Sequence, residues 1–371
     1  YWFLRMQRTG IPGYGLLAGM GLSLAMLCRP LTAAAVGLPF GCWLAWWWIR
    51  GDGHEAVRWR HLRVGFVASP LVAGLAVMGW YNHQLTGDWT TTPYQVFTDK
   101  YTPRHVYGFD NVERGEQRIA GMDRVERQRV LHHYDRWAEN LDAELAVRNV
   151  VSRVVESGKW TVGLVALLMT SVVVLAGFLL GTAPLPGSRW LPVVMAILCV
   201  HLVHVPYWYA GIMDWHYVFE TAPLWCLLVA GVTVRLWQEA GRVGRPGVAL
   251  AWLGLLLVTP VTSYLDFEPV WAPSRIDAAV NNVGFARARH AEFRKRVSRR
   301  AGSDPALVLV KPDPTDRHID FVVNKPMLDT PLLVGRYIPK VVPMSRVLNL
   351  FPGRRVFVFD AGRGDMREIR R

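Results

Sequence analysis

Arg29 stands between two long apolar segments of the chain, directly after Cys28 and before Pro30. An arginine at membrane depth costs about 3 kcal/mol to insert and usually has an anionic partner. Its planar guanidinium matches the oxygens of a phosphate, so a lipid phosphate is a natural partner. The alternative is an arginine whose long side chain only reaches the aqueous interface. We predict phosphate binding by Arg29, and the alternative stays open.

A second cluster combines imidazole, phenol and carboxylate groups over a short stretch. Its members are His201, His204, Tyr207, Asp214, His216, Tyr217 and Glu220. His201 and His204 are three residues apart and therefore share a helix face. Ionisable groups at a membrane boundary usually serve function, and histidine exchanges protons near neutral pH. The alternative is an aromatic belt with incidental polar residues, because Trp and Tyr collect at membrane interfaces.

A third polar stretch runs from Tyr81 to Asp110 and is rich in Tyr and Thr. Hydroxyl groups of this kind both donate and accept hydrogen bonds, which suits recognition of a hydroxylated substrate. The predicted substrate-binding residues are Tyr94, Tyr101, His204, Tyr207 and Glu220. The alternative is an ordinary outer loop that packs on the helices.

No metal site or cofactor is predicted, and a divalent cation cannot be assigned to any residues. The two histidines have no third ligand at a fixed spacing. The cysteines lie inside apolar segments without metal-ligand spacing, so we interpret them as packing residues: Cys28, Cys42, Cys199 and Cys226. The sequence also contains no Walker, dinucleotide-binding or zinc-protease motif.

The composition is typical of a membrane protein. Of 371 residues, 51% are hydrophobic and 17 are tryptophan, and the apolar residues gather in blocks. The formal net charge is +13, and much of it falls in short loops between these blocks, where it sets topology. We therefore predict membrane lipids as partners, and no nucleic acid.

These elements predict a polytopic α-helical membrane protein with about seven spans. A span needs about 20 residues, because a helix rises about 1.5 Å per residue through a core of about 30 Å. The predicted spans cover approximately residues 11–28, 31–49, 64–82, 160–180, 191–208, 219–234 and 247–264.

The short basic loops predict the orientation of the spans. Residues 50–63 and 235–246 are arginine-rich, and the N-terminal stub carries Arg5 and Arg8, so all three should be cytoplasmic. The Arg29 turn, the loop at 83–159, the turn at 209–217 and the tail from 265 then share the outer face. This is the outer face of an inner (plasma) membrane.

The chain is predicted to have two domains. Residues 1–264 form the transmembrane bundle with the outer loop at 83–159, in which residues 122–156 have amphipathic helical spacing. Residues 265–371 form a small extracytoplasmic α/β domain. It begins with an arginine-rich helix over 275–300, followed by short apolar strands at 306–310, 319–323 and 356–359.

Three short sequence segments resemble those of a known family. They are Gly15-Leu-Leu-Ala-Gly-Met-Gly-Leu-Ser-Leu-Ala-Met-Leu-Cys-Arg29-Pro30, His216-Tyr-Val-Phe-Glu-Thr-Ala-Pro223 and Phe351-Pro-Gly-Arg-Arg-Val356. They resemble the multi-pass GT-C type glycosyltransferases (family 39-like), relatives of protein O-mannosyltransferases and aminoarabinose transferases. The resemblance implies inverting transfer of a sugar from a polyprenyl-phosphate donor to an acceptor on the outer face.

The resemblance also implies roles for individual residues. Arg29, His216 and Tyr217 would bind the donor phosphate. The general base of the family is an acid in the first outer loop, which we expect upstream of Tyr1, because the sequence begins like the end of an earlier span. This chain alone would then be an inactive C-terminal part, with Asp214 and His216 as weak local catalytic candidates.

Two functions of other classes remain as alternatives. A transporter or flippase of a lipid-linked substrate would need a continuous polar path, and the predicted spans carry no chain of acidic residues. A non-catalytic membrane scaffold would use the outer domain to bind a partner. The sugar, the acceptor and the oligomeric state cannot be read from the sequence.

Overall fold

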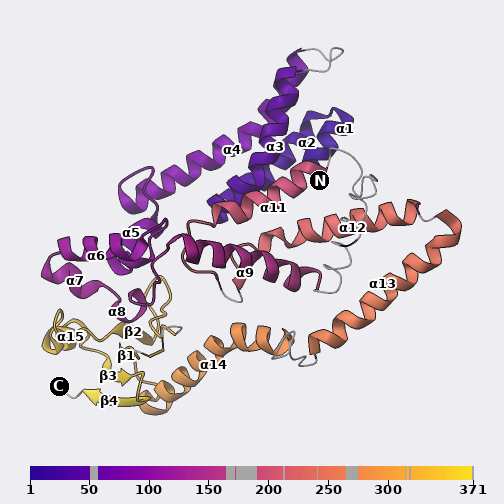
Figure 1. Cartoon of the computed structure of the whole chain (residues 1–371). Coiled ribbons are helices and arrows are strands. Elements are labelled where there is room, and N and C mark those ends of the chain that lie inside the picture. The colour runs from indigo at the N-terminus through magenta and orange to yellow at the C-terminus, as the bar shows by residue number, and fades with distance from the viewer. Residues whose placement is uncertain are drawn as a thin grey trace. The chain divides into compact units, whose positions relative to one another are not determined.

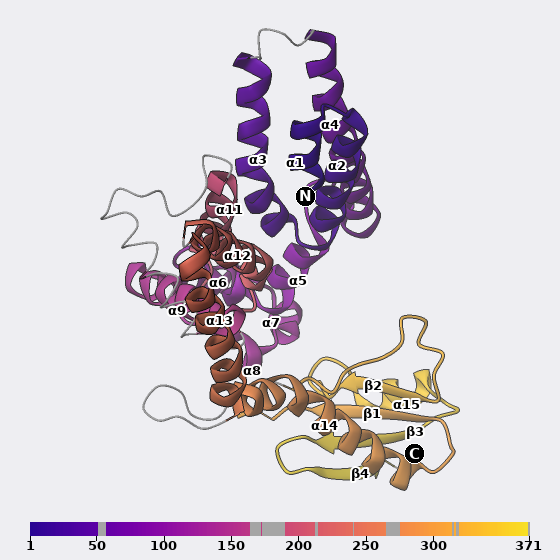
Figure 2. The ribbon, with the colours of Figure 1, turned by 90° about the vertical axis from the view of Figure 1, so that its right-hand side faces the viewer.

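The computed structural model describes residues 1–50, 57–163, 172, 190–211, 214–239, 241–264, 275–313, 315–316 and 319–369. The chain divides into two compact units (Figures 1 and 2). The helical unit comprises Tyr1–Val96 and Leu141–Ser263, and the mixed unit comprises Phe97–Asn140 and Tyr264–Arg371. The main predicted boundary, at 264/265, therefore lies beside an observed one, whereas residues 97–140 group with the C-terminal residues.

The helical unit is built mainly from helices, and most of them are apolar. They are α1 (Trp2–Thr9), α2 (Pro12–Cys28), α3 (Pro30–Arg50), α4 (Val57–Thr86), α9 (Ala143–Thr161), α11 (Leu191–Val203), the 3₁₀ turn η4 (Phe219–Thr221), α12 (Ala222–Glu239) and α13 (Gly241–Tyr264). Helix α5 (Pro93–Tyr101) crosses the boundary between the units.

Arg29 forms the joint between α2 and α3. Pro30 opens α3, and a residue before proline is driven out of the helical conformation by the proline ring. Arg29 accordingly has φ −144° and ψ 82°. The Arg29-Pro30 pair therefore ends one helix and starts the next.

Three helices among the described residues are long and apolar enough to cross a membrane: Pro30–Arg50, Val57–Thr86 and Phe219–Glu239. Helices α2 and α11 are apolar but shorter, and α13 contains the predicted span 247–264 without being one of the three. Most of the predicted span 160–180 lies outside the described residues. These helices indicate membrane association, and the predicted number of about seven spans is not supported.

Small residues let α2 approach α4 closely. Gly15, Gly19 and Ser23 follow one another at intervals of four and are the buried residues of α2. A Cβ at Gly19 would overlap the carbonyl oxygen of Val67, and one at Gly74 of α4 would overlap Ser23. Such spacing is typical of helices packed in membranes, where close backbone contact replaces the hydrophobic effect. This contact fixes the helix that ends at Arg29.

The mixed unit contains short helices and a four-stranded sheet. Its elements are η1 (Pro103–His105), α6 (Asn111–Gly121), α7 (Arg124–Arg129), α8 (His132–Asp135), α14 (Arg275–Ala301), β1 (Ala306–Lys311), β2 (Leu332–Arg336), α15 (Met344–Leu350), β3 (Arg355–Asp360) and β4 (Asp365–Ile369). The strand order is β2-β1-β3-β4, with β1 parallel to β2 and β3, and β4 antiparallel to β3.

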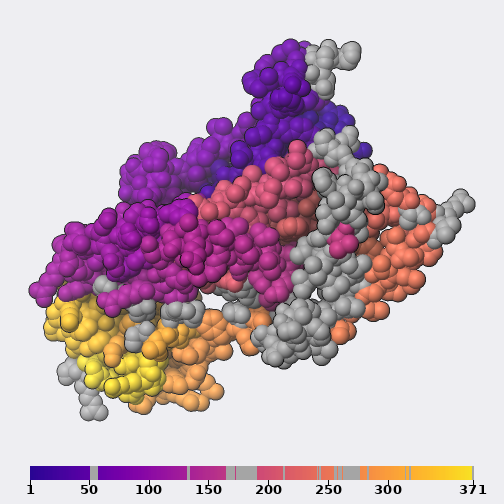
Figure 3. Space-filling model, in the orientation of Figure 1, coloured from indigo at the N-terminus to yellow at the C-terminus, as the bar shows by residue number. Residues whose placement is uncertain are grey.

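The sheet is covered on both faces, as buried parallel strands require. Phe293 and Val297 of α14 pack with Val308, Phe357 and other side chains on one face. On the other face, Val347 of α15 packs with Leu307, Val358 and their neighbours. Figure 3 shows the orange residues of α14 lying directly against the yellow residues of the strands. The small C-terminal sheet is therefore confirmed.

The predicted helix over 275–300 and the strands at 306–310 and 356–359 are confirmed, but the strand predicted at 319–323 is wrong. Residues Ile319 and Phe321 are buried in the core without pairing. The amide side chain of Asn324 instead donates to the carbonyl oxygen of Val334 (2.7 Å) and accepts from its N–H (2.8 Å). It thereby caps the edge of β2, a strand that the sequence pattern did not reveal.

We predict that Gly19→Ala lowers the stability of the helical unit by about 1–3 kcal/mol, because the new Cβ must push α4 away from α2. The matched control is Gly21→Ala on the same helix, where no atom lies within 4 Å of the added Cβ. Thermal unfolding in detergent, followed by tryptophan fluorescence, compares the two. Equal stability of both variants would contradict the proposed close contact.

Candidate functional site

Arg29 meets Glu220 in the helical unit, although the two residues are 191 positions apart. Nη1 of Arg29 donates to Oε1 of Glu220 and lies 3.4 Å from the carbonyl oxygen of His216. The guanidinium carbon lies 5.7 Å from the centre of the Phe219 ring. All three partners come from the segment that leads into α12.

One edge of the Arg29 guanidinium has no hydrogen-bond partner among the described residues. Within the described part of the chain, only Nη1 of Arg29 is hydrogen-bonded, and the side chain is 35% exposed. The Nε and Nη2 groups form the edge that binds two oxygens of one phosphate or carboxylate. Arg29 is therefore anchored on one side and available on the other.

Glu220 is held in the turn η4 at the start of α12. Its side chain is 21% exposed, and Oε2 is buried without a hydrogen-bond partner among the described residues. A carboxylate at a helix N-terminus is favoured by the helix dipole. The ion pair offsets part of the cost of burying either charge alone.

Aromatic and imidazole rings surround this pair. The hydroxyl of Tyr217 donates to that of Tyr207 at 3.1 Å, and the two rings meet edge to face. Tyr217 also stacks on His204, with 5.8 Å between ring centres, and contacts the ring of His216. Nδ1 of His204 lies 2.8 Å from the carbonyl oxygen of Val200, which fixes the orientation of the His204 ring.

The hydroxyl of Tyr94, on α5, lies beside the hydroxyl of Tyr207. The Tyr94 ring is largely exposed, but burial of its hydroxyl raises the pKa of Tyr94, and a hydrogen bond with Tyr207 adds to this effect. The phenol is therefore protonated at neutral pH and acts as a hydrogen-bond donor. Three tyrosine hydroxyls, those of Tyr94, Tyr207 and Tyr217, form one connected group.

Arg153 of α9 holds the turn that carries these residues. It is completely buried and donates to the carbonyl oxygens of His204 (2.5 Å), Tyr207 (3.0 Å), Tyr209 (2.7 Å) and Ala210 (3.1 Å). Burial lowers the pKa of Arg153 to about 10, so the guanidinium remains charged at neutral pH. A single side chain thus satisfies four carbonyl groups of an irregular segment.

Two other residues of α9 form hydrogen bonds with the segment that Arg153 holds. Asn149, one helical turn before Arg153, donates to the carbonyl oxygen of Trp208 at 2.7 Å. The hydroxyl of Ser152 donates to Oδ2 of Asp214 at 2.9 Å. Asp214 has φ +56°, a left-handed conformation that is uncommon for residues other than glycine. The segment from His204 to Gly211, and Asp214 after it, are therefore held by one face of α9.

His216 is neutral in this environment. Burial lowers the pKa of His216 to about 4, and the nearby charges of Arg29 and Arg153 act in the same direction. A Cβ at Gly211, which has φ +121°, would lie 2.9 Å from Nδ1 of His216. Glycine is thus needed there for the turn to pack against the imidazole.

The structure brings together most of the predicted site residues: Arg29, Tyr94, His204, Tyr207, His216, Tyr217 and Glu220. Tyr101 belongs to the mixed unit, where its ring packs on that of Phe97. His201 is buried in α11, and neither ring nitrogen has a hydrogen-bond partner in the described ranges. Asp214 is held by Ser152.

Arg153 and Asn149 were missed in the sequence. Their signal was present, because the buried residues of α9 recur at helical spacing and include these two polar side chains. A basic residue on the buried face of an amphipathic helix needs a hydrogen-bond or ion-pair partner, because burial of an unpaired charge is costly. When the partners of a buried arginine are backbone carbonyl groups, no residue type in the sequence identifies them.

The site offers hydrogen-bond donors and one cation rather than metal ligands. Among the described residues, no group of three or more His, Cys, Asp or Glu side chains could hold a metal ion. An arginine edge, neutral histidine and tyrosine hydroxyls suit a phosphate or another oxyanion.

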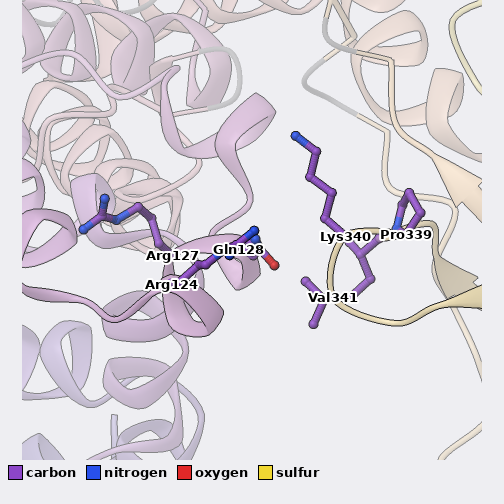
Figure 4. A pocket seen from close by; sticks show the side chains of 7 residues that line it. Arg124, Arg127, Gln128, Pro339, Lys340 and Val341 are labelled. Atoms are coloured by element: carbon purple, nitrogen blue, oxygen red, sulfur yellow. The ribbon is translucent and has the colours of Figure 1, made fainter.

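A second space in the mixed unit does not have this organisation. Its volume is about 620 Å³, and it is lined by Arg124, Arg127, Gln128, Ile338, Pro339, Lys340 and Val341. Figure 4 shows Arg127 pointing away from Lys340. Arg127 also donates to the carbonyl oxygens of Ala120 and Met122. The basic groups do not converge on one point.

Comparison with known proteins adds no family to this description. No protein-family model matches the chain, and neither a curated protein nor a solved structure shows significant similarity to it. The site is therefore interpreted from its own geometry.

We predict that Arg153→Met destabilises the helical unit by about 3 kcal/mol or more, since four carbonyl oxygens lose a charged donor. Arg148→Met, at an exposed arginine of the same helix, is the control and should cost little. Thermal unfolding and hydrogen exchange over residues 204–211 measure the effect. Unchanged exchange in this segment would show that Arg153 does not hold it.

We also predict an acid-sensitive contribution from His216. Its folded pKa of about 4 lies below the ordinary value of 6.5. Between these values the unfolded chain binds a proton that the folded chain does not, so stability falls as the pH falls from 6.5 to 4. His216→Asn should reduce the fall in unfolding temperature over this window, and part of the fall should remain because burial also lowers the pKa of His105. Parallel profiles for both proteins would contradict a buried neutral histidine.

Proposed function

We propose that the protein is a membrane glycosyltransferase that moves a sugar from a polyprenyl-phosphate donor to an acceptor. The observation that carries the proposal is the half-open guanidinium of Arg29, anchored by Glu220 with its other edge unpaired among the described residues. This arginine lies at the end of an apolar helix, where a lipid phosphate would be found. The resemblance to GT-C type transferases supports the same assignment.

The proposed chemistry requires stabilisation of a departing phosphate. The acceptor oxygen forms a bond to C1 of the sugar, the bond from C1 to the phosphate oxygen breaks, and polyprenyl phosphate leaves with the electron pair. Arg29 would offset the charge on that phosphate. Tyr217 and neutral His216 would contribute hydrogen bonds rather than charge. Tyr94, Tyr207, His204 and Glu220 would contact the sugar or the acceptor, and Tyr101 is proposed as a further contact.

The acceptor proton must pass to a base. Glu220 is paired with Arg29, and Asp214 accepts from Ser152. Neither carboxylate is assigned as the base.

The proposal includes the membrane arrangement. About seven spans would place the Arg29 turn, the loop at 83–159 and the domain at 265–371 on the outer face of the plasma membrane, with the basic loops inside. Labelling of single cysteines from each side of sealed vesicles tests this arrangement. Reaction of residues 50–63 and 83–159 from the same side would overturn it.

Donor binding provides a direct test of Arg29. The full chain in lipid nanodiscs should bind a long-chain polyprenyl monophosphate at least tenfold more tightly than the polyprenol that lacks the phosphate, because Arg29 binds the phosphate oxygens. Arg29→Ala should remove this preference, and Arg50→Ala, at an exposed arginine, should retain it. Equal binding of both lipids by the unmodified chain would refute phosphate recognition.

The rate of sugar transfer tests His216. His216→Ala should lower the rate of transfer from the lipid donor, because a hydrogen bond to the donor phosphate is lost. An unchanged rate would give His216 a structural role only. Lipid movement across vesicles without sugar transfer would favour a flippase, and function without Arg29 and His216 would favour a scaffold.

A further inference from the structure

A large cavity lies in the helical unit at the other end of α2. Its volume is about 1,090 Å³, and its lining includes Arg5, Arg8, Arg63, Trp43, Trp47 and Trp190. Arg63 reaches the start of α2, where its Nε donates to the carbonyl oxygen of Gly10 at 3.0 Å. Arg29 follows the last residue of α2, so the helix of 17 residues separates the two sites by about 26 Å.

The cavity is cationic. Three arginines line it, and none of the described residues around it is acidic. Arg8 is exposed and makes no hydrogen bond or ion pair with any described residue. The side-chain nitrogen of Gln7, which also lines the cavity, is buried without a hydrogen-bond partner. These groups can donate hydrogen bonds to an anion that none of the described lining residues supplies.

The other walls are apolar and aromatic. The guanidinium of Arg63 lies over the ring of Trp47, at 5.2 Å from its centre, and Leu4, Val193 and Leu227 complete the lining. A soluble anion would use only the arginines. A ligand with a phosphate and acyl chains would contact both the arginines and the apolar wall. Arginine and tryptophan side chains together are typical of the membrane interface, where such lipids lie.

We propose that this cavity binds the headgroup phosphate of an anionic phospholipid, with the acyl chains along its aromatic wall. The site differs from the candidate donor site, because it shares no residue with it. It belongs to the helix ends that carry the basic loops, where anionic lipid is attracted by basic residues. The inference requires membrane association but not sugar transfer.

Native mass spectrometry of the full chain in detergent tests this site. We expect retention of phosphatidylglycerol at an affinity at least fivefold above that of phosphatidylcholine. Arg8→Gln and Arg5→Gln should each lower the phosphatidylglycerol affinity about fivefold, the effect of one basic residue near an anionic surface. Both positions are exposed, so the variants should fold.

One control separates this site from general charge effects. Arg50→Gln removes an exposed arginine that stacks on Trp46 outside the cavity, and it should retain phosphatidylglycerol fully. Equal affinity for the two phospholipids, or an equal loss in Arg50→Gln, would overturn the proposal. Glycerol phosphate bound as tightly as phosphatidylglycerol would show a site for soluble anions and also overturn it.

Discussion

The backbone contact between α2 and α4 determines where the candidate site can form. Gly15, Gly19 and Ser23 leave no room for a larger side chain along this line. In an apolar environment helices gain little from burying apolar surface, so close packing must supply the association energy. With α2 fixed in this way, the break before Pro30 places Arg29 at one point. The position of the guanidinium therefore depends on small side chains that never touch it.

The second part of the site depends on a different interaction. The segment after α11 is irregular, and its carbonyl groups would be costly to bury without donors. Arg153 supplies donors to four of these groups, and Asn149 supplies one more. The guanidinium of Arg153 is hydrogen-bonded to several carbonyl oxygens, and its charge also helps to keep His216 neutral. One buried residue thus shapes the turn and sets its electrostatics.

The sequence was informative where a pattern is local. Pro30 after an apolar block predicted the break at Arg29, short apolar runs predicted β1 and β3, and an arginine-rich stretch predicted α14. It was uninformative where the partner is distant in sequence. The contact between Arg29 and Glu220 joins positions 191 apart. The edge of β2 is capped by the side chain of Asn324, so the apolar run at 319–323 resembled a strand but packs without pairing.

The ion pair of Arg29 and Glu220 explains how a half-exposed arginine can be kept ready for an anion. An unpaired guanidinium in an apolar region would be costly, and a fully paired one would have no donors left. Here Nη1 of Arg29 contacts Glu220 and the carbonyl oxygen of His216. The edge formed by Nε and Nη2 has no partner among the described residues. Glu220 therefore acts as a positioning residue, whose charge offsets that of Arg29 without using the edge that matches a phosphate. An incoming phosphate would meet this fixed edge at the end of α2, with the tyrosine hydroxyls as further donors.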